Sequence, residues 1–189
     1  MVRIVHASVV VQQVDALVNA ANSSLAGGGG VDGALHKAAG PRLDVACKKL
    51  HDAGGCPVGE ARITSAFDIT WARHIIHTVG PIYANHTPQE SDELLRKCYI
   101  NSCEAALQAG DQSIAFPAIS CGVYGYPLDR ALVVSLSALV PYEQRFQDIV
   151  LAMFMQTEFE TATAVAKELY PSSWRSDALV VHLSGDRAQ

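Results

Sequence analysis

The sequence lacks any hydrophobic run long enough to cross a membrane. No segment reaches the ~18 uninterrupted apolar residues of a membrane span, and the N-terminal MVRIVHASVVVQQVDALV has no cationic stretch before a long apolar core. Cysteine is scarce: there are five, an odd number, with no pair of C-x-x-C units. This pattern argues against a disulfide framework and a zinc site and is typical of a reducing compartment. We therefore expect a soluble cytoplasmic protein without a metal or membrane association.

Positive charge is also scarce. Fourteen Lys and Arg residues stand against 19 Asp and Glu residues, which gives a formal net charge of -5. Direct nucleic-acid binding depends largely on cationic side chains that displace counterions, so the composition argues against it. A phosphate-bearing ligand would have to be held by a local arrangement of donors.

A chain of 189 residues, 49% hydrophobic and 17% charged, is long enough for one domain with a sizeable core. Short β-rich runs alternate along it with helical patterns. The expected strands are Val2–His6, Ala16–Asn19, Ala61–Ala66, His74–Val79, Ser113–Phe116 and Ile149–Phe154. The expected helices are Val31–Leu50, Ser91–Ala109, Leu128–Val140 and Phe159–Leu169. The alternation predicts an α/β fold, a three-layer α/β/α sandwich with a mixed, largely parallel sheet.

Residues 1–170 form the predicted single domain. Residues 171–189 form a C-terminal extension, in which the apolar Ala178–Leu183 is either an extra edge strand or a frayed end.

The most informative segment is Val14–Gly40, VDALVNAANSSLAGGGGVDGALHKAAG. A buried strand runs into a polar turn, then into the glycines Gly27–Gly30, and then into a helix. A glycine-rich link into a helix N-terminus presents unpaired N–H groups to an anion. The segment is neither a Walker A loop nor a G-x-G-x-x-G fingerprint. The alternative is a mobile linker, which the entropic cost of four glycines between a strand and a helix disfavours.

Three polar side chains flank the glycines. Asn19 and Asn22 precede them, and the carboxylate of Asp32 lies near the first helical turn. Taken alone, Asp32 could simply complement the helix dipole, and either asparagine could be a turn residue. Their candidacy as site residues depends on the neighbouring loop.

A second loop, FPAISCGVYGYP over Phe116–Pro127, follows another apolar strand. Its small residues permit close approach of the backbone to a ligand. Two such loops make a stronger case than one, because a diphosphate needs donors on both sides.

Other candidates are weaker. His74 and His77 lie three apart on an expected strand and face opposite ways, so they cannot easily share a metal. Cys121 could be a nucleophile, but no histidine lies near it in sequence, and packing as a small apolar side chain is favoured.

At the two loops and at the intervening IIHTVGPIY, the sequence resembles the macrodomain family, and within it the MacroD-type ADP-ribose hydrolases. The resemblance extends from about Val14 to Val140. It implies a mixed sheet in an α/β/α sandwich, in agreement with the pattern of elements, and a cleft for ADP-ribose with the diphosphate between the two glycine loops.

The resemblance also implies roles for particular residues. Asn22 matches the asparagine that holds the distal ribose, and Asp32 matches the catalytic acid. The implied substrates are mono-ADP-ribosylated acidic side chains of proteins and O-acetyl-ADP-ribose, and the chemistry requires no cofactor. The substrate-binding residues implied by the match are Ser8, Val9, Asn19, Gly28, Gly29, Gly30, Val31, Ser120, Cys121, Gly122, Val123, Tyr124, Gly125 and Phe154.

The sequence departs from the family pattern at the adenine side. The family often has Gly-Asp-Ile-Thr where this chain has Ala7-Ser8-Val9-Val10, so a neutral hydroxyl replaces the carboxylate that accepts from the adenine amino group. Weaker adenine discrimination or compensation by another residue is expected. Phe154 lies where the family often places an aromatic ring against adenine, with Phe159 as a competing candidate and core packing as an alternative for both.

Three functions remain open from the sequence: a hydrolase of ADP-ribose linkages, a non-catalytic module that only reads ADP-ribose, and a regulatory partner protein. The presence of both Asn22 and Asp32 favours hydrolysis.

Overall fold

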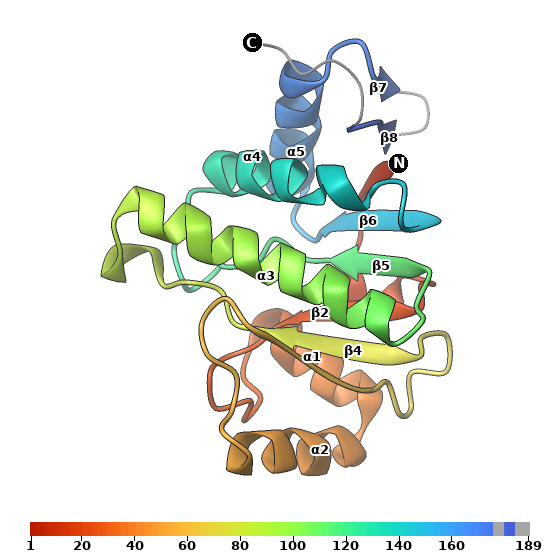
Figure 1. The fold of residues 1–189 in the computed structure, drawn as a ribbon, viewed down its shortest axis with the longest axis vertical. Coiled ribbons are helices and arrows are strands. Elements are labelled where there is room, and N and C mark those ends of the chain that lie inside the picture. The colour runs from red at the N-terminus through yellow and green to blue at the C-terminus, as the bar shows by residue number, and fades with distance from the viewer. Residues whose placement is uncertain (176–179, 184–189) are drawn as a thin grey trace.

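The computed structural model describes residues 1–175 and 180–183. In this part of the chain, eight strands form one sheet in the order β3-β4-β2-β5-β6-β1-β8-β7 (Figure 1). The strands are β1 Val2–His6, β2 Ala16–Ala20, β3 Ala61–Ser65, β4 His74–Thr78, β5 Ser113–Phe116, β6 Asp148–Met153, β7 Trp174–Arg175 and β8 Val180–Val181. The central strands from β4 to β1 are parallel, whereas β3, β8 and β7 pair antiparallel at the edges. The predicted mixed, largely parallel sheet is confirmed.

Helices cover both faces of the sheet. The helices are α1 Gly30–Ala39, α2 Pro41–Asp52, α3 Pro88–Gln108, α4 Leu128–Leu139 and α5 Gln156–Leu169. Contacts place α1 and α2 on one face and α3, α4 and α5 on the other, and Figure 1 shows α3 crossing in front of the strands. The three-layer α/β/α architecture is therefore confirmed.

The core is divided in two by the sheet because successive strand residues point to opposite faces. In β2, the side chain of Leu17 packs with the α1 and α2 layer, whereas Val18 packs with the α3 to α5 layer. Both residues are fully buried. This explains why β2 is a continuous apolar run rather than an alternating one.

The predicted helix over Val31–Leu50 is wrong in one respect, because it is two helices. Gly40 separates α1 from α2 with a φ of 75°, a left-handed conformation that favours glycine, and Pro41 then begins α2. A Cβ at Gly40 would also clash with the carboxylate of Asp68. A helical period that continues across this break conceals it in the sequence.

Element boundaries differ slightly elsewhere. Helix α3 begins at Pro88, before the predicted Ser91, because Thr87 and Glu90 form a capping box there. Of the segment Ala178–Leu183, Val180–Val181 forms β8, which pairs with β1 and extends the sheet. Residues 178 and 179 lie outside the described residues. The boundary at residue 170 stays a prediction.

Candidate functional site

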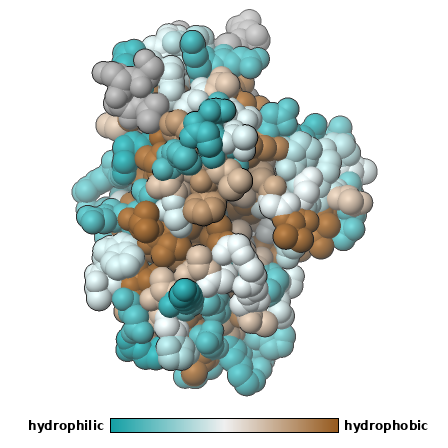
Figure 2. Space-filling view, turned by 180° about the vertical axis from the view of Figure 1, so that it is seen from behind, coloured by the Kyte–Doolittle hydropathy of each residue, from teal (hydrophilic) through white to brown (hydrophobic). Residues whose placement is uncertain are grey.

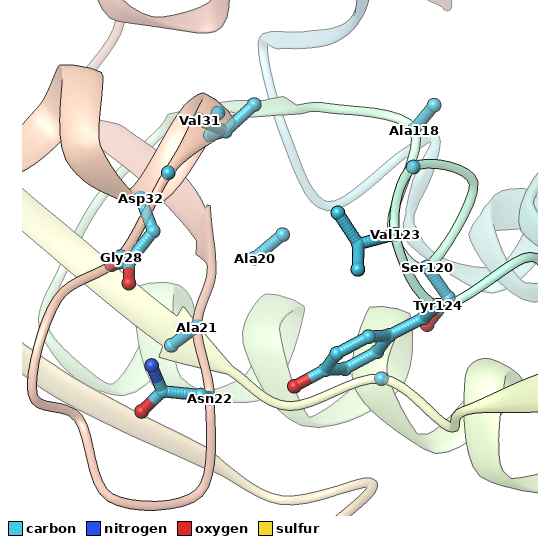
Figure 3. Close-up of a pocket in the computed structure, with 14 residues that line it drawn as sticks. Ala20, Ala21, Asn22, Gly28, Val31, Asp32, Ala118, Ser120, Val123 and Tyr124 are labelled. Atoms are coloured by element: carbon cyan, nitrogen blue, oxygen red, sulfur yellow. The ribbon is translucent and has the colours of Figure 1, made fainter.

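A cavity of about 420 Å³ lies where β2, β4 and β5 end. These neighbouring strands are parallel, so their carboxyl ends meet at one edge of the sheet, the usual position of ligand sites in such folds. Asn22 and Asp32 lie on one side of the cavity, and Ser120, Val123 and Tyr124 on the other (Figure 3). The lining residues are Ala20, Ala21, Asn22, Gly28, Gly29, Gly30, Val31, Asp32, Gly80, Ala118, Ser120, Gly122, Val123 and Tyr124.

One wall is the link from β2 into α1. Gly29 is the N-cap of α1 and makes no side-chain cap, so the first N–H groups of the helix have no intrahelical acceptor. A Cβ built on Gly29 or Gly30 would have no described atom within 4 Å. The open N-terminus of a helix attracts anions. This wall can therefore hold a phosphate without a cationic side chain, and none of the lining residues is Lys or Arg.

Asn22 shapes that wall. Its Nδ2 donates to the carbonyl of Gly27 at 2.9 Å, and its Oδ1 accepts from the hydroxyl of Ser24 at 2.7 Å and from the N–H of Ala26 at 3.3 Å. The side chain thus closes the loop on itself and stays at the edge of the cavity. An amide nitrogen has two hydrogens, so Nδ2 can still donate to a ligand.

Asp32 lies in the same wall and is 5% exposed. Its Oδ1 accepts from Nδ2 of Asn19 at 2.6 Å and lies 3.5 Å from Nε2 of His36. Its Oδ2 faces the other way, 3.4 Å from the position that a Cβ on Gly28 would occupy. One carboxylate oxygen is therefore held by the protein while the other faces the space beside Gly28 and Asn22.

Asn19 connects Asp32 to a buried histidine. The register of β2 and β4 places Asn19 beside His77, and Nδ2 of Asn19 lies 3.1 Å from Nδ1 of His77. Because Nδ2 is a donor, Nδ1 of His77 accepts and Nε2–H donates to the hydroxyl of Thr64 at 3.0 Å. Burial, and then the nearby His36, lower the pKa of His77 to about 3. His77 is thus a neutral support behind Asn19.

This buried histidine makes folding stability depend on pH. An unfolded histidine has a pKa of about 6.5, whereas His77 in the folded protein has a pKa of about 3. Between these two pH values, the imidazole of residue 77 binds a proton in the unfolded chain but not in the folded chain. Stability is therefore complete above about pH 6.5 and falls as the pH decreases, by up to about 1.4 kcal/mol per pH unit. Urea unfolding at about pH 7 and about pH 5 is expected to show a larger loss for the wild type than for His77→Asn. Equal losses would contradict the assignment.

The opposite wall is the loop after β5. Ser120 has a φ of 65°, an uncommon conformation for a residue with a side chain, and its Oγ is buried without a hydrogen-bond partner among the described residues. A Cβ on Gly80, which follows β4, would clash with Ser120. The N–H of Tyr83 donates to the carbonyl of Tyr124 at 3.0 Å and ties this loop to the segment after β4. Close packing therefore holds Ser120 in its strained position at the cavity.

Hydrophobic residues gather around the hollowed centre of the face opposite α3 (Figure 2). Val123 at the cavity rim is fully exposed, with a relative accessibility of 102%.

Within the described residues, no group of three or more His, Cys, Asp or Glu side chains is arranged to hold a metal ion. No helix of residues 1–175 is long and apolar enough to cross a membrane.

Comparison with known proteins decides the family, because the Macro domain family matches residues 18–135. The chain is a macrodomain. It is 49% identical over 144 residues to a Macro domain-containing protein of Methanosarcina mazei, which covers 76% of this chain and 74% of that protein. It is 40% identical over 163 residues to the Mus musculus ADP-ribose glycohydrolase MACROD2, which covers 84% of this chain but only 34% of that longer protein.

Solved macrodomains have the same fold. The Oceanobacillus iheyensis macrodomain with ADP superposes with a TM-score of 0.81 at 40% identity, covering 87% of this chain and 88% of that one. The Trypanosoma brucei macrodomain in complex with ADP-ribose superposes with a TM-score of 0.76 at 38% identity, covering 85% and 67%. The predicted macrodomain membership is confirmed.

Ten of the sixteen residues predicted for the site of this macrodomain line the cavity: Asn22, Gly28, Gly29, Gly30, Val31, Asp32, Ser120, Gly122, Val123 and Tyr124. Their assignment to a ligand stays a prediction. Asn19 lies behind Asp32 instead of at the cavity surface. Cys121 and Gly125 belong to the second loop but are not among the lining residues, and burial raises the pKa of the Cys121 thiol to about 12, which disfavours a nucleophilic thiolate.

The remaining predicted residues lie at the ends of β1 and β6. The Oγ of Ser8 accepts from the N–H of Val10 at 3.3 Å and caps a short 3-10 helix, Val9–Val11, in which Val9 is 2% exposed. Phe154 follows β6 and is 66% exposed. These three residues do not line the cavity, and their proposed contacts with adenine stay predictions.

Five residues near this site were not predicted from the sequence. Ala20, Ala21, Gly80 and Ala118 line the cavity as strand ends and small neighbours of the loops. His36 was also missed, although it lies four residues after Asp32 and hence on the same face of α1. That spacing was the available signal for His36. For the small residues, only the strand order brings them together.

Proposed function

We propose that this macrodomain binds ADP-ribose in the cavity between its two glycine-bearing loops. The relatives solved with ADP-ribose and ADP support this ligand. The open N-terminus of α1 offers backbone donors to a diphosphate, and the hydroxyl of Ser120 can donate from the opposite wall. The mono-ADP-ribosylated partner proteins would then approach from the open side of the cavity.

We further propose that the protein is a hydrolase that removes ADP-ribose from mono-ADP-ribosylated acidic side chains, or acetate from O-acetyl-ADP-ribose. Its 40% sequence identity to an ADP-ribose glycohydrolase supports the reaction class. Asn22 would orient the distal ribose. Oδ2 of Asp32, beside Gly28, would orient a water molecule and accept its proton, while Asn19 holds Oδ1 in place.

The position of Asp32 carries this proposal. Its carboxylate is nearly buried, is fixed through one oxygen, and presents the other beside Asn22 in the cavity wall. A group that only complemented the helix dipole would need neither the contact with Asn19 nor the position in the cavity.

The decisive experiment measures release of ADP-ribose from a glutamate-linked mono-ADP-ribosylated protein and of acetate from O-acetyl-ADP-ribose. ADP-ribose binding is measured in parallel by calorimetry. Release from either substrate, together with binding, supports the hydrolase. Binding without release would identify a module that reads ADP-ribose, and absence of both would overturn the ligand as well.

Binding is expected to tolerate salt. Lys and Arg do not line the cavity, so backbone dipoles and hydrogen bonds would hold the diphosphate. Calorimetry at about 50 mM and about 500 mM NaCl should give dissociation constants within about threefold, because few counterions are released on binding. A fall in affinity of about a hundredfold, as expected for a cationic groove, would contradict this arrangement.

We also propose a cytoplasmic location. All five cysteines are free, and four of them are buried, which suits a reducing compartment.

A further inference from the structure

A second cavity of about 270 Å³ lies on the other side of the loop that holds Asn22. Asn22 and Gly28 line the first cavity, whereas three residues between them line the second: Ser24, Leu25 and Ala26. The residues that line the second cavity are Ser24, Leu25, Ala26, His36, Asp44, Lys48 and His51. The loop is therefore a thin wall between the candidate active site and a second opening formed by α1 and α2.

His36 joins the two sides of this wall. Its side chain is 12% exposed, and its Nε2 lies 3.5 Å from Oδ1 of Asp32 in the first cavity. Its Nδ1 lies 2.6 Å from Oδ1 of Asp44, which lines the second cavity and is 66% exposed. The ring is also packed beside Gly27, where an added Cβ would lie 3.6 Å from Nδ1. Asp44, His36 and Asp32 thus form a continuous line from solvent to the candidate active site.

The contact with Asp44 decides which nitrogen of the His36 ring carries the hydrogen. A carboxylate only accepts, so the short contact requires that Nδ1 of His36 carry a hydrogen and donate it to Asp44. Nε2 then faces Oδ1 of Asp32, and it is buried without a hydrogen-bond partner among the described residues. A bare Nε2 beside the carboxylate of Asp32 is a proton acceptor on the inner side of the ring.

We propose that Asp44 is a positioning residue of the hydrolase: it holds the ring of His36 so that Nε2 faces Asp32 and can take the proton that Asp32 receives from water. This inference rests on the proposed hydrolytic function. Asp44 contacts neither substrate nor the reacting atoms and acts only through His36. A carboxylate that orients a histidine in this way has a large effect on catalysis in enzymes of other folds.

The proton balance of the reaction agrees with this role. Hydrolysis of an ester forms one bond from carbon to the water oxygen, breaks one ester C–O bond, and yields an alcohol and a carboxylate. One proton is therefore left over in each turnover at neutral pH. It is received at Asp32 and passes to Nε2 of His36, so that the doubly protonated ring lies between the carboxylates of Asp32 and Asp44. When the product has left, Nε2 releases the proton to water, and the ring again carries hydrogen only on Nδ1, as at the start.

Several charges surround this pathway. The groups facing His36 are Asp32 on α1, Asp44, Lys48 and His51 on α2, and His77 on β4. The pKa of His77 is lowered to about 3 by burial, so His77 is neutral over the working pH range. Of the two anions, Asp44 is the one that can be changed without altering the cavity in which substrate would bind.

The test compares Asp44→Asn with Asp52→Asn. Both remove one negative charge from α2, but Asp52 is 58% exposed and pairs with Lys48 at 3.0 Å, without lining either cavity. Turnover of a mono-ADP-ribosylated protein is measured from about pH 5.5 to about pH 9, together with calorimetric ADP-ribose binding, the Tm and histidine-selective NMR of His36.

For Asp44→Asn, kcat is expected to fall about tenfold or more, while KM and the Kd for ADP-ribose stay within about twofold. Because Nδ1 of His36 would lose the carboxylate that accepts its hydrogen, the pH profile of kcat and the histidine-selective NMR signals of the two ring nitrogens should differ from those of the wild type. Asp44→Glu should restore part of kcat, and Asp52→Asn should behave as the wild type.

Other outcomes separate the two proposals. Turnover and a pH profile that are unchanged in Asp44→Asn overturn the role of Asp44 and leave the hydrolase intact. A lowered Tm and weakened binding with an unchanged pH profile identify a structural role and also overturn it. A wild-type protein without turnover overturns the proposed function itself, and the role of Asp44 with it.

Discussion

Asp32→Asn is expected to lower hydrolysis by about 10²- to 10⁴-fold, the range typical for loss of a general base, while the affinity for ADP-ribose stays within about twofold. The amide has the size of the carboxylate and can still accept from Nδ2 of Asn19, which now lies 2.6 Å from Oδ1. The substitution therefore removes the charge and the basicity without opening a gap in the wall. Binding should persist because the donors proposed for the diphosphate lie elsewhere, at the N-terminus of α1 and at Ser120.

The matched control for this variant is Asp129→Asn. Asp129 is the acidic residue in the first turn of α4, as Asp32 is in the first turn of α1, but it is exposed and does not line the cavity. Loss of its charge reports the effect of the helix dipole alone, which is about 0.3–1 kcal/mol. Full turnover in Asp32→Asn, measured by release of ADP-ribose, would remove Asp32 from the mechanism.

Gly33→Ala is expected to damage both the fold and the binding site. Gly33 lies inside α1, and a Cβ there would overlap the carbonyl oxygen of Gly28, which is backbone and can move only with the whole loop. The cost of such overpacking is about 1–3 kcal/mol, which exceeds the gain of up to about 1 kcal/mol from replacing glycine by alanine in a helix. Because Gly28 lies between Asn22 and Asp32, its displacement should also weaken ADP-ribose binding about tenfold or more, by the loss of at least one hydrogen bond to a charged group.

Gly29→Ala is the corresponding control. It lies in the same loop at the N-cap of α1, has a φ of -93°, and an added Cβ would meet no described atom within 4 Å. Its Tm should equal that of the wild type. Thermal unfolding of the two variants therefore distinguishes a strained loop from the mere presence of a methyl group. Gly29 itself lines the cavity, so its variant is a control for stability and not for binding. A wild-type Tm and affinity in Gly33→Ala would show that the loop adapts freely.

Much of the fold was predictable from local patterns. The buried runs became β2, β4, β5 and β6 because a parallel sheet covered on both faces requires apolar residues at successive positions. The break at Gly40 was not predictable from the helical period, since the residues on both sides of it continue the same apolar face. Gly40 has a left-handed backbone, and the carboxylate of Asp68, which is distant in sequence, lies in the space that a Cβ would need.

The candidate site, like the fold, was predictable from the sequence only in part. The two glycine-bearing loops were recognisable because glycines follow apolar strands at short spacing, and the roles of Asn22 and Asp32 were implied by the resemblance to macrodomains. The position of Asn19 was not. It is one residue among the apolar positions of β2, and only its register with β4 places it against His77 and turns its amide toward Asp32.

The sequence alone therefore determined the kind of elements, the two loops and the family to which the chain belongs. These properties depend on residues that are close together in the chain, where backbone preferences and periodicity act. Only the tertiary structure decided that β2, β4 and β5 end side by side and that His77 is a neutral support behind Asn19. Each of these depends on contacts between segments far apart in sequence, which strand order and packing create and which no local pattern encodes.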